Sequence, residues 1–503
     1  MGRPLQGLTF ATAGDGTALA YGVRLLRLLG ALVVPEADAP GGVVGALTDG
    51  RPPLASVPWR AAVGEPHHSW AASGAMALTG EEDGFPVSPG WALAAALVGA
   101  AGVLGLLSQL LGTPVDVDGP ALLGERAANA GLHRRGRVSP GGACRLIRAA
   151  DGWLAVSLPR PDDFAAVPAW LDAGGPGDGG TADDWWDFVA AFAGNGRAAA
   201  LEERAGLLGL AVSHLGVPSD AAGDAQALAR GQRWPVAPFL VHASPRGRQG
   251  ASGRRNRAQP PGRPLVVDLS SLWAGPLCAN LLGLAGARVV KVESISRPDG
   301  ARLGPASFFQ LLHAGHRSVA LPLDRKWGRA ALRHLLAEAD VVVEGSRPRA
   351  MEQLGIDPRH VVDAGAVWVS ITAYGRTGPW RNRVGFGDDA AISAGLVAGP
   401  PEAPILCADA AADPVAGIHA AVAAVACLLG GGGYLVDVSM REAVAAGLAT
   451  RRLPEVIATP SAGGWEADLG EVSVPVAPPR SRAVPGTVAR LGADTSAVLA
   501  GLR

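Results

Sequence analysis

The chain has 503 residues, a formal net charge of −1 and 48% hydrophobic residues. This length and apolar content suit two or three domains with buried cores, and the near-neutral charge argues against a nucleic-acid or polyanion binder. The four cysteines (Cys144, Cys278, Cys407 and Cys427) are too widely spaced to indicate a disulfide framework or a zinc site, so no metal is expected.

The first 135 residues have the pattern of an α/β unit. A strand candidate, LQGLTFA (5–11), precedes RLLRLLGALVVPE (24–36), which combines an apolar helix end, a Gly-Ala turn and a Val-rich strand. Continuous apolar strands of this kind are typical of a parallel sheet. The run WALAAALVGAAGVLGLLSQLLG (91–112) is long enough to cross a bilayer, but its Ala and Gly content favours a buried core helix.

The middle of the chain predicts a smaller α+β domain over residues 136–241. A strand-turn-strand pattern surrounds Asp151-Gly152, and ADDWWDFVAAFAG (182–194) has the pattern of an amphipathic helix. Residues 242–262 are predicted to form a linker, because their basic, Gly- and Ser-containing run leads into two prolines.

After this linker the chain repeats itself. Four segments of the first unit find similar segments, in the same order, in the second: RLLRLLGALVVPE (24–36) with NLLGLAGARVVKVE (280–293), SWAASGAMALTG (69–80) with DAAISAGLVAG (389–399), the helix 91–111 with 418–429, and TPVDVDGPALLGERAA (113–128) with YLVDVSMREAVAAGLA (434–449). This order predicts two copies of one α/β unit, 1–135 and 263–450, with PVDVD and LVDVS as matching strands and 451–503 as a tail. Because the 91–112 helix matches a helix of the second unit, a membrane span is further disfavoured.

The two copies differ in their acidic residues. Between Gly84 and Pro114 the first copy has none, whereas the second places Asp409 and Asp413 just before the matching helix. A helix cap would be useful in both copies, and Ser88 is available for that role in the first. The asymmetry therefore favours a chemical role for an aspartate of the second copy. Asp413 is preferred because Gly417 follows it by four residues, and Asp409 remains the competitor.

Residues 264–502 resemble class III CoA-transferases, the CaiB/BaiF family. The resemblance is carried by VVDLSSLWAGPLCANLLGLAGARVVKVE, GHRSVALPL, ADVVVEGSRPRAMEQLGID, ITAYGRTGPW, VDVSMREAV and the tail LGADTSAVLAGL. It implies an α/β fold of Rossmann-like parallel-sheet units, here two interlocked copies plus the smaller α+β domain. The first copy and the middle domain resemble a second, degenerate family member. Because the family forms interlocked homodimers, the chain is expected to be a pseudo-dimer by itself, and whether it also forms a homodimer stays open.

The family resemblance also implies an activity. Its members move coenzyme A from an acyl-CoA to a carboxylic acid, with an aspartate in a D-x-x-x-G setting as the nucleophile; Asp413 to Gly417 fit that setting. A carboxylate can hold the acyl group as a mixed anhydride and then CoA as a thioester, and helix-start N–H groups can stabilise the oxyanions. No permanently bound cofactor is expected, only coenzyme A and acyl-CoA as substrates. Gly417 is expected to let the thioester approach the backbone.

Several further residues are implied as CoA-binding or as site support. The CoA-binding set is Trp273, Ala274, Gly275, Lys291, His316, Arg317, Gly345, Ser346 and Arg347. The sequence departs from the family where Gly345 replaces a typical Asn and Gln353 a common Arg. Asp388 and its neighbour Asp389 are read either as a helix N-cap or as groups that orient a substrate. His419 is read either as a packed core residue or as part of the site.

Three alternative functions stay open. Family relatives that racemise 2-methylacyl-CoA use a histidine where this chain has Phe386, and a phenyl ring carries no proton. A CoA-dependent lyase and a non-catalytic CoA-binding protein are the others. No nucleic-acid or membrane partner is expected, and a cytoplasmic location is expected because the N-terminus lacks the pattern of a secretory signal.

Overall fold

The centre of the molecule is a seven-stranded sheet in the order β11-β10-β9-β12-β13-β16-β8. A computed structural model describes residues 2–38, 44–48, 66–176, 180–217, 220–231, 236–246, 263–470, 472–484 and 486–502. The strands are β8 (Phe239–Ala243), β9 (Leu265–Asp268), β10 (Arg288–Ser294), β11 (Arg317–Leu321), β12 (Val341–Glu344), β13 (Val367–Thr372) and β16 (Tyr434–Ser439). All neighbours pair in parallel except β8, which runs antiparallel to β16. The predicted α/β class with a mostly parallel sheet is confirmed.

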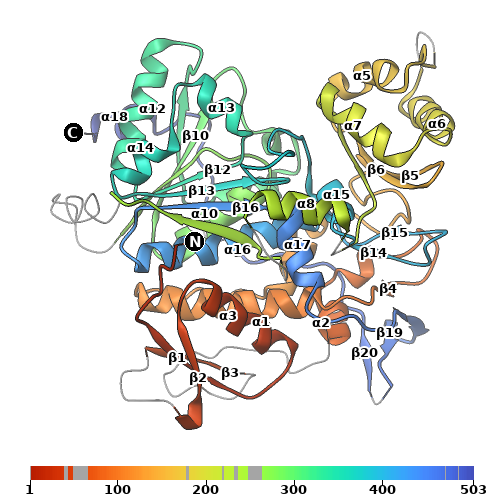
Figure 1. Ribbon diagram of the computed structural model, residues 1–503, viewed down its shortest axis with the longest axis horizontal. Coiled ribbons are helices and arrows are strands. Elements are labelled where there is room, and N and C mark those ends of the chain that lie inside the picture. Colours follow the sequence, from red (N-terminus) through yellow and green to blue (C-terminus); the bar gives the residue numbers. More distant parts are fainter. Residues whose placement is uncertain are drawn as a thin grey trace.

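Helices cover both faces of this sheet, which explains its uninterrupted apolar strands. Val266 of β9 packs in the core shared with α10 (Ala274–Leu284) and α16 (Ala412–Leu429), whereas Val267 faces the core with α12 (Lys326–Glu338). A strand buried on both faces needs apolar residues at consecutive positions. The second layer also contains α13 (Pro348–Gln353), α14 (Pro358–Asp363) and α18 (Thr495–Ala500) (Figure 1).

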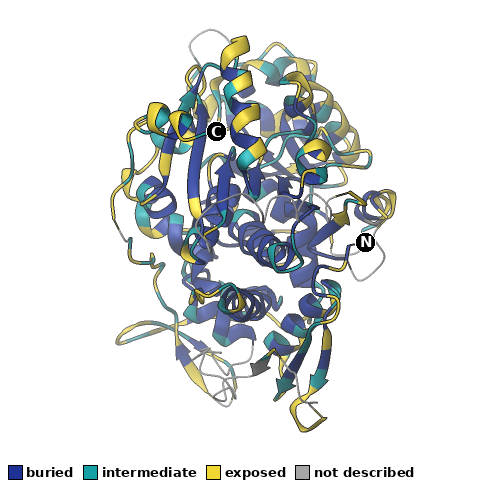
Figure 2. Ribbon diagram, turned by 90° about the vertical axis from the view of Figure 1, so that its left-hand side faces the viewer, coloured by how far each residue is buried: buried dark blue, intermediate teal, exposed yellow. Residues whose placement is uncertain are grey.

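The segment predicted to be the first copy (1–135) forms a smaller layer on the outer side of α16. Its sheet has the parallel order β2-β1-β3, from β1 (Thr9–Ala13), β2 (Leu32–Pro35) and β3 (Gly45–Thr48), covered by α1 (Thr17–Leu28) and α3 (Leu93–Leu110). α3 contacts both α1 and α16. The helices α3 and α16 are long and apolar enough to cross a membrane, but both are mostly buried inside the protein, where the burial colouring is darkest (Figure 2).

Residues 144–214 of the middle segment form a separate group of strands and helices (Figure 1). Its antiparallel strands β5 (Cys144–Ala149), β6 (Gly152–Ser157) and β7 (Ala211–His214) pack with α5 (Pro161–Leu171), α6 (Ala182–Ala193) and α7 (Ala198–Leu208) around their own core. The domain also contacts α15 (Gly387–Ser393), which belongs to the second copy. Two polypeptide regions far apart in sequence therefore share this interface (Figure 1).

The C-terminal tail packs back onto the first copy. β17 (Val456–Ile457) pairs with β4 (Val87–Ser88), and β20 (Ser473–Pro475) contacts α2 (Pro66–Ala72). The other short elements are α4 (Glu125–Ala130), α8 (Ala221–Ala229), α11 (Ala306–His313), α17 (Met440–Leu448), β14 (Val397–Ala398), β15 (Ile405–Leu406), β18 (Thr459–Ser461), β19 (Gly464–Asp468) and four 3₁₀ turns, Glu36–Asp38, Met76–Leu78, Pro120–Gly124 and Gly300–Leu303.

Two details differ from the sequence-based expectations. LVDVS lies in β16, but PVDVD (114–118) forms no strand, because the described sheet of the first copy has no pairing strand beside it. The first two residues of the predicted linker, His242 and Ala243, belong to β8, which pairs with and covers the edge of β16. Residues 247–262 of that linker lie outside the described residues.

The contact between α16 and α10 depends on Gly417. An ideal Cβ at this position would lie 2.8 Å from the Ala274 carbonyl oxygen and 2.9 Å from Cδ2 of Leu277. The expectation that Gly417 opens the backbone to a thioester is therefore wrong, because α10 fills that space. The missing side chain instead lets the two helices approach closely.

Replacing Gly417 by alanine is expected to destabilise the protein by about 1–3 kcal/mol, because the new methyl group would push α16 away from the α10 backbone. Gly206→Ala in α7 is the control: its Cβ would meet only the Arg383 side chain, at 3.7 Å. Urea unfolding of both variants measures the difference. A Gly417→Ala protein as stable as the Gly206→Ala control would contradict this packing argument.

Candidate active site

The Asp413 carboxylate lies where two long helices begin. Asp413 is the second residue of α16, and its Oδ1 accepts a hydrogen bond from the N–H of Ala274, the first residue of α10, at 3.3 Å. Asp413 was expected to precede its helix and instead lies in the first turn. Both helix dipoles favour negative charge here. The residue is partly exposed, although its neighbours Ala412 and Pro414 are buried.

Burial opposes this ionisation. Desolvation raises the pKa of Asp413 to about 7, Arg126 and the Ala274 N–H lower it in part, and the nearby Asp388 and Asp409 raise it. A carboxyl with this pKa exists in both protonation states near neutral pH. The deprotonated form is a carboxylate with little solvent to screen it, which makes it a stronger nucleophile than a carboxylate in water.

Gly387, the first residue of α15, closes one side of the site. An ideal Cβ there would lie 2.1 Å from Oδ2 of Asp413 and 2.4 Å from the Ala410 carbonyl oxygen. Any side chain at this position would displace the Asp413 carboxylate. This role was not predicted from the sequence, although the glycines of GFGDD were the available signal.

Asp409, the other candidate nucleophile, is engaged in an ion pair. It is fully buried, and both its oxygens accept from Arg126 of α4, at 2.8 Å from Nε and 2.5 Å from Nη2. Arg126 comes from the first copy, 283 residues earlier in the chain. Arg126 was not predicted from the sequence, because its neighbours in the chain form no motif that indicates a site.

Asp388 and Asp389 have different partners, and neither is the N-cap residue of α15, which is Phe386. Asp389 accepts from the Phe386 N–H at 2.8 Å and from the Ser157 hydroxyl at 3.0 Å. Asp388 accepts from the Ala410 N–H at 2.8 Å, and burial together with Asp409 raises its pKa to about 6. The capping reading thus holds in part for Asp389, whereas Asp388 belongs to the acidic group around Asp413.

Comparison with known proteins identifies the second half of the chain. Residues 264–478 match the model of CoA-transferase family III. This segment is therefore similar to that family.

The individual relatives cover only part of the chain. An acyl-CoA transferase of Fusarium pseudograminearum is 34% identical over 149 residues, which are 26% of this chain and 33% of the relative. A succinyl-CoA–D-citramalate CoA-transferase of Chloroflexus aurantiacus is 31% identical over 218 residues, 39% of this chain and 54% of the relative. A CaiB/BaiF family crystal structure from Brucella suis has 25% identity and a TM-score of 0.36, covering 40% of this chain and 64% of that one. The chain thus spans about a third to a half of the two curated relatives.

The turn between β9 and α10 contributes a backbone N–H to the candidate site, and its side chains do not contact Asp413. Trp273 is buried and makes an edge-to-face contact with Phe308, with ring centroids 5.4 Å apart. Gly275 faces Ser270, whose Cβ would be 2.2 Å from an ideal Cβ at the glycine. Ala274 provides the N–H that reaches Asp413. Of these three residues, Ala274 is therefore the one that contacts the candidate nucleophile.

Lys291 is buried inside an ion cluster. Its Nζ lies 2.8 Å from Oδ2 of Asp299 and 3.5 Å from Oδ2 of Asp268. Burial alone would lower the pKa of Lys291, but these carboxylates raise it above its ordinary value. The side chain therefore supports the β9–β10 region and leaves no charge facing solvent.

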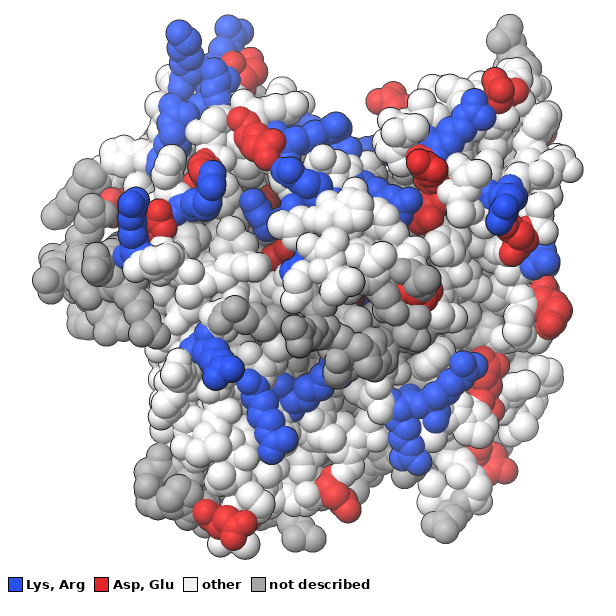
Figure 3. Space-filling model, in the orientation of Figure 1, with Lys and Arg blue, Asp and Glu red and all other residues white. Residues whose placement is uncertain are grey.

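Arg347 lies among other arginines at the carboxyl ends of the strands. It is half-buried at the N-cap of α13, and burial together with Arg349, Arg160 and Arg297 lowers its pKa. Arg160 comes from the small domain. Figure 3 shows basic side chains along the hollow between the two upper lobes.

The loop before Arg347 contributes little side-chain chemistry. The Ser346 hydroxyl donates to the buried Glu344 at 2.8 Å, and Gly345 is exposed beside it. The Ser346 side chain is thus bound within its own loop. Gly345 leaves its backbone exposed at the carboxyl ends of the strands, where Arg347 also lies.

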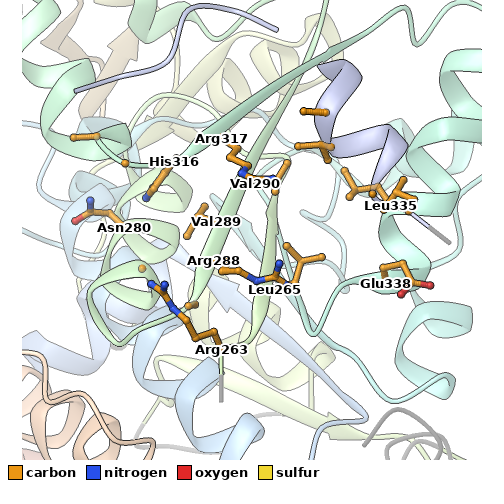
Figure 4. Close-up of a pocket in the computed structure, with 18 of the residues that line it drawn as sticks. Arg263, Leu265, Asn280, Arg288, Val289, Val290, His316, Arg317, Leu335 and Glu338 are labelled. Atoms are coloured by element: carbon orange, nitrogen blue, oxygen red, sulfur yellow. The ribbon is translucent and has the colours of Figure 1, made fainter. Parts of the chain in front are cut away.

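His316 and Arg317 lie at the amino ends of the parallel strands, whereas Asp413 lies at their carboxyl ends. They mark the start of β11 and line a cavity of about 520 Å³ with Arg263 and Arg288 (Figure 4). Burial lowers the pKa of His316 to about 4. The structure therefore does not bring this pair together with Asp413 or Arg347.

His419 connects the two copies. Its Nε2 lies 2.8 Å from the Tyr21 hydroxyl of α1, and its Nδ1 lies 2.6 Å from the Val415 carbonyl oxygen. Burial lowers its pKa to about 4. These contacts agree with the packed-core reading of this histidine.

Substitution of Lys291 by methionine is expected to destabilise the fold by about 3–5 kcal/mol, because two buried carboxylates would lose their cation. Lys326→Met is the matched control, since Lys326 is the only other lysine and is exposed. Thermal unfolding measures both. Unchanged stability of Lys291→Met with weakened binding of coenzyme A would instead assign Lys291 to the ligand.

Proposed function

We propose that the chain is a CoA-transferase that moves coenzyme A from an acyl-CoA to a carboxylic acid through covalent intermediates on Asp413. The observation that carries this proposal is the partly exposed Asp413 carboxylate at the starts of α10 and α16, within a family III segment. Neighbouring Asp409 is occupied by Arg126, which leaves Asp413 as the available nucleophile.

The reaction proceeds by four acyl transfers that need no net proton. The Asp413 carboxylate attacks the thioester carbonyl, which forms a mixed anhydride and releases the CoA thiolate. The thiolate then attacks the aspartyl carbonyl, which yields the aspartyl-CoA thioester and releases the donor acid. The acceptor carboxylate attacks this thioester to give a second anhydride and thiolate. Attack of the thiolate on the acceptor's acyl carbon forms the new acyl-CoA and regenerates Asp413.

The site geometry suits these transfers. In the second and third transfers the tetrahedral intermediate forms on the Asp413 carbonyl carbon, and the Ala274 N–H already donates to an oxygen of that group. The start of α10 adds its dipole without any reorganisation. Gly387 keeps the carboxylate fixed from the other side, so that both anhydride and thioester form at one position.

The arginine group at Arg347 suits the polar end of coenzyme A. Arg347, Arg349 and Arg297 come from the family segment and Arg160 from the small domain, and their mutual repulsion is relieved when an anion binds between them. This edge of the sheet also holds the start of α10. We assign the phosphates of coenzyme A to these arginines, in place of His316 and Arg317.

The two copies are proposed to be related by an internal two-fold arrangement. Gly30 and Gly286 end the first helix of each copy with φ values of 94° and 96°. In the first copy, an ideal Cβ at Gly99 of α3 would lie 2.3 Å from the Ala18 carbonyl oxygen of α1, as Gly417 of α16 meets Ala274 of α10. Counting back four residues from Gly99, as from Gly417 to Asp413, gives Ala95. The first copy therefore has alanine where the nucleophile would be.

The copies also exchange their outer parts. The small domain that follows the first copy packs on α15 of the second, and the tail that follows the second packs on α2 and β4 of the first. This reciprocal packing supports an interlocked pseudo-dimer within one chain. It also supports the division into a degenerate first copy, a small domain and a catalytic second copy.

The racemase alternative is less well supported, since Phe386 occupies the N-cap of α15 next to the site and carries no exchangeable proton. A lyase or a non-catalytic CoA-binding protein would leave no covalent adduct on Asp413.

The direct test is intact-protein mass spectrometry after incubation with a panel of acyl-CoA thioesters, including succinyl-CoA because a relative bears that name. Hydroxylamine should trap an adduct that peptide mapping places on Asp413. Asp413→Asn should lose the adduct completely and still bind coenzyme A. A protein that binds coenzyme A but forms no adduct with any thioester would overturn the proposal.

Adduct formation should increase with pH through a midpoint near 7. The deprotonated carboxylate is the nucleophile, and burial raises the pKa of Asp413 to about 7, so protonation removes reactivity below that pH. Initial rates of adduct formation between pH 5 and 9 measure the midpoint. A rate that stays constant down to pH 5 would show that a group with an ordinary carboxyl pKa reacts instead.

A further inference from the structure

The loop that leads into α16 has an unfavourable backbone. Ala408 and Ala410 have φ values of 59° and 44°, in the left-handed region that residues with a Cβ rarely adopt. Two such residues within three positions are held only when surrounding contacts fix them, and backbone strain of this kind is concentrated at functional sites. Asp413 follows this loop directly.

The contacts that hold the loop come from the first copy (Thr79 and Arg126), from Gly136 at the start of the middle segment, and from Asp388. The Leu406 N–H donates to the Gly136 carbonyl at 2.9 Å, and the Ala408 N–H donates to Oγ1 of Thr79 at 3.1 Å. Arg126 binds both oxygens of Asp409. Within the second copy, Asp388 holds the Ala410 N–H.

Arg126 is also the cation that offsets the acidic group. Asp388 from α15, Asp409 from the loop and Asp413 from α16 face one another, and α10, the other helix at the site, has no charged residue. The Arg126 side chain is 30% exposed, whereas Asp409 is fully buried. The guanidinium thus lies between the buried aspartate and the open part of the site.

We propose that the first copy has been retained as a working part of the active site, and that Arg126 is a positioning residue which fixes the loop presenting Asp413 and offsets the charge of Asp409. This inference rests on the proposed function, because it concerns how Asp413 is made ready to react. Arg126 lies outside residues 264–478, so the family segment alone would lack this cation.

Two substitutions should change the reactivity of Asp413 in opposite directions. Arg126→Gln removes the positive charge and leaves Asp409 unpaired, so the pH midpoint of adduct formation should shift upward. Asp409→Asn removes a negative neighbour, so the midpoint should shift downward. Arg126→Lys keeps the charge but loses the two-point contact, and it should restore most of the wild-type midpoint.

The experiment combines this pH profile with amide hydrogen exchange of the peptide that covers residues 405–412, in the full-length chain. Arg126→Gln should accelerate exchange in this peptide by about tenfold or more, because the loop loses a charged, two-point anchor. Arg359→Gln is the matched control, since it removes an exposed arginine bound to Asp357 and should change neither readout.

The outcomes separate this inference from the proposed function. If the wild-type chain forms no adduct at any pH, the proposed function fails, and the exchange rates still decide whether Arg126 fixes the loop. If the wild-type chain forms the adduct but Arg126→Gln keeps both the midpoint and the exchange rate, the inference is overturned. Midpoints that move in the same direction for Arg126→Gln and Asp409→Asn would also overturn it.

Discussion

The close packing of α16 on α10 is the constraint on which the site depends. Gly417 lets the first turns of the two helices approach until the Asp413 carboxylate meets the Ala274 N–H. Burial raises the pKa of this carboxyl to about 7, and the Ala274 N–H lowers it in part. One glycine therefore determines how closely the Asp413 carboxylate and the Ala274 N–H approach each other.

Around this contact, the two predicted copies contribute different residues. In the second copy the helix pair carries Asp413, whereas the corresponding helices of the first copy pack with Ala95 at the proposed matching position. The first copy still contributes α3 to the core against α16, and Tyr21, Thr79 and Arg126 reach across to residues of the second copy. The first copy could thus lose the proposed nucleophile and keep its fold, because its residues still hold the site around Asp413.

Much of the fold was predictable because it depends on local pattern. Val-rich strands buried on both faces indicated the parallel sheet, and the absence of acidic residues before α3 pointed to Asp413. Long-range contacts were not predictable in this way. Arg126 meets Asp409 only through the tertiary arrangement, and the burial of Lys291 depends on Asp299 and Asp268 approaching it. Gly417 was noticed for its spacing from Asp413, but its true neighbour is a helix that no local pattern could place beside it. His316 and Arg317 were assigned by family position, and the direction of β11 places them at the other edge of the sheet.

The central claim, that Asp413 itself carries the acyl group and then coenzyme A, is tested most directly by an oxygen tracer. With a donor acyl-CoA that forms the adduct and an acceptor acid labelled with ¹⁸O in its carboxylate, the second anhydride places one acceptor oxygen on the aspartate. Peptide mass spectrometry after turnover should find ¹⁸O in the peptide with Asp413 and in no other acidic residue. Formation of labelled acyl-CoA without any label on Asp413 would contradict the account.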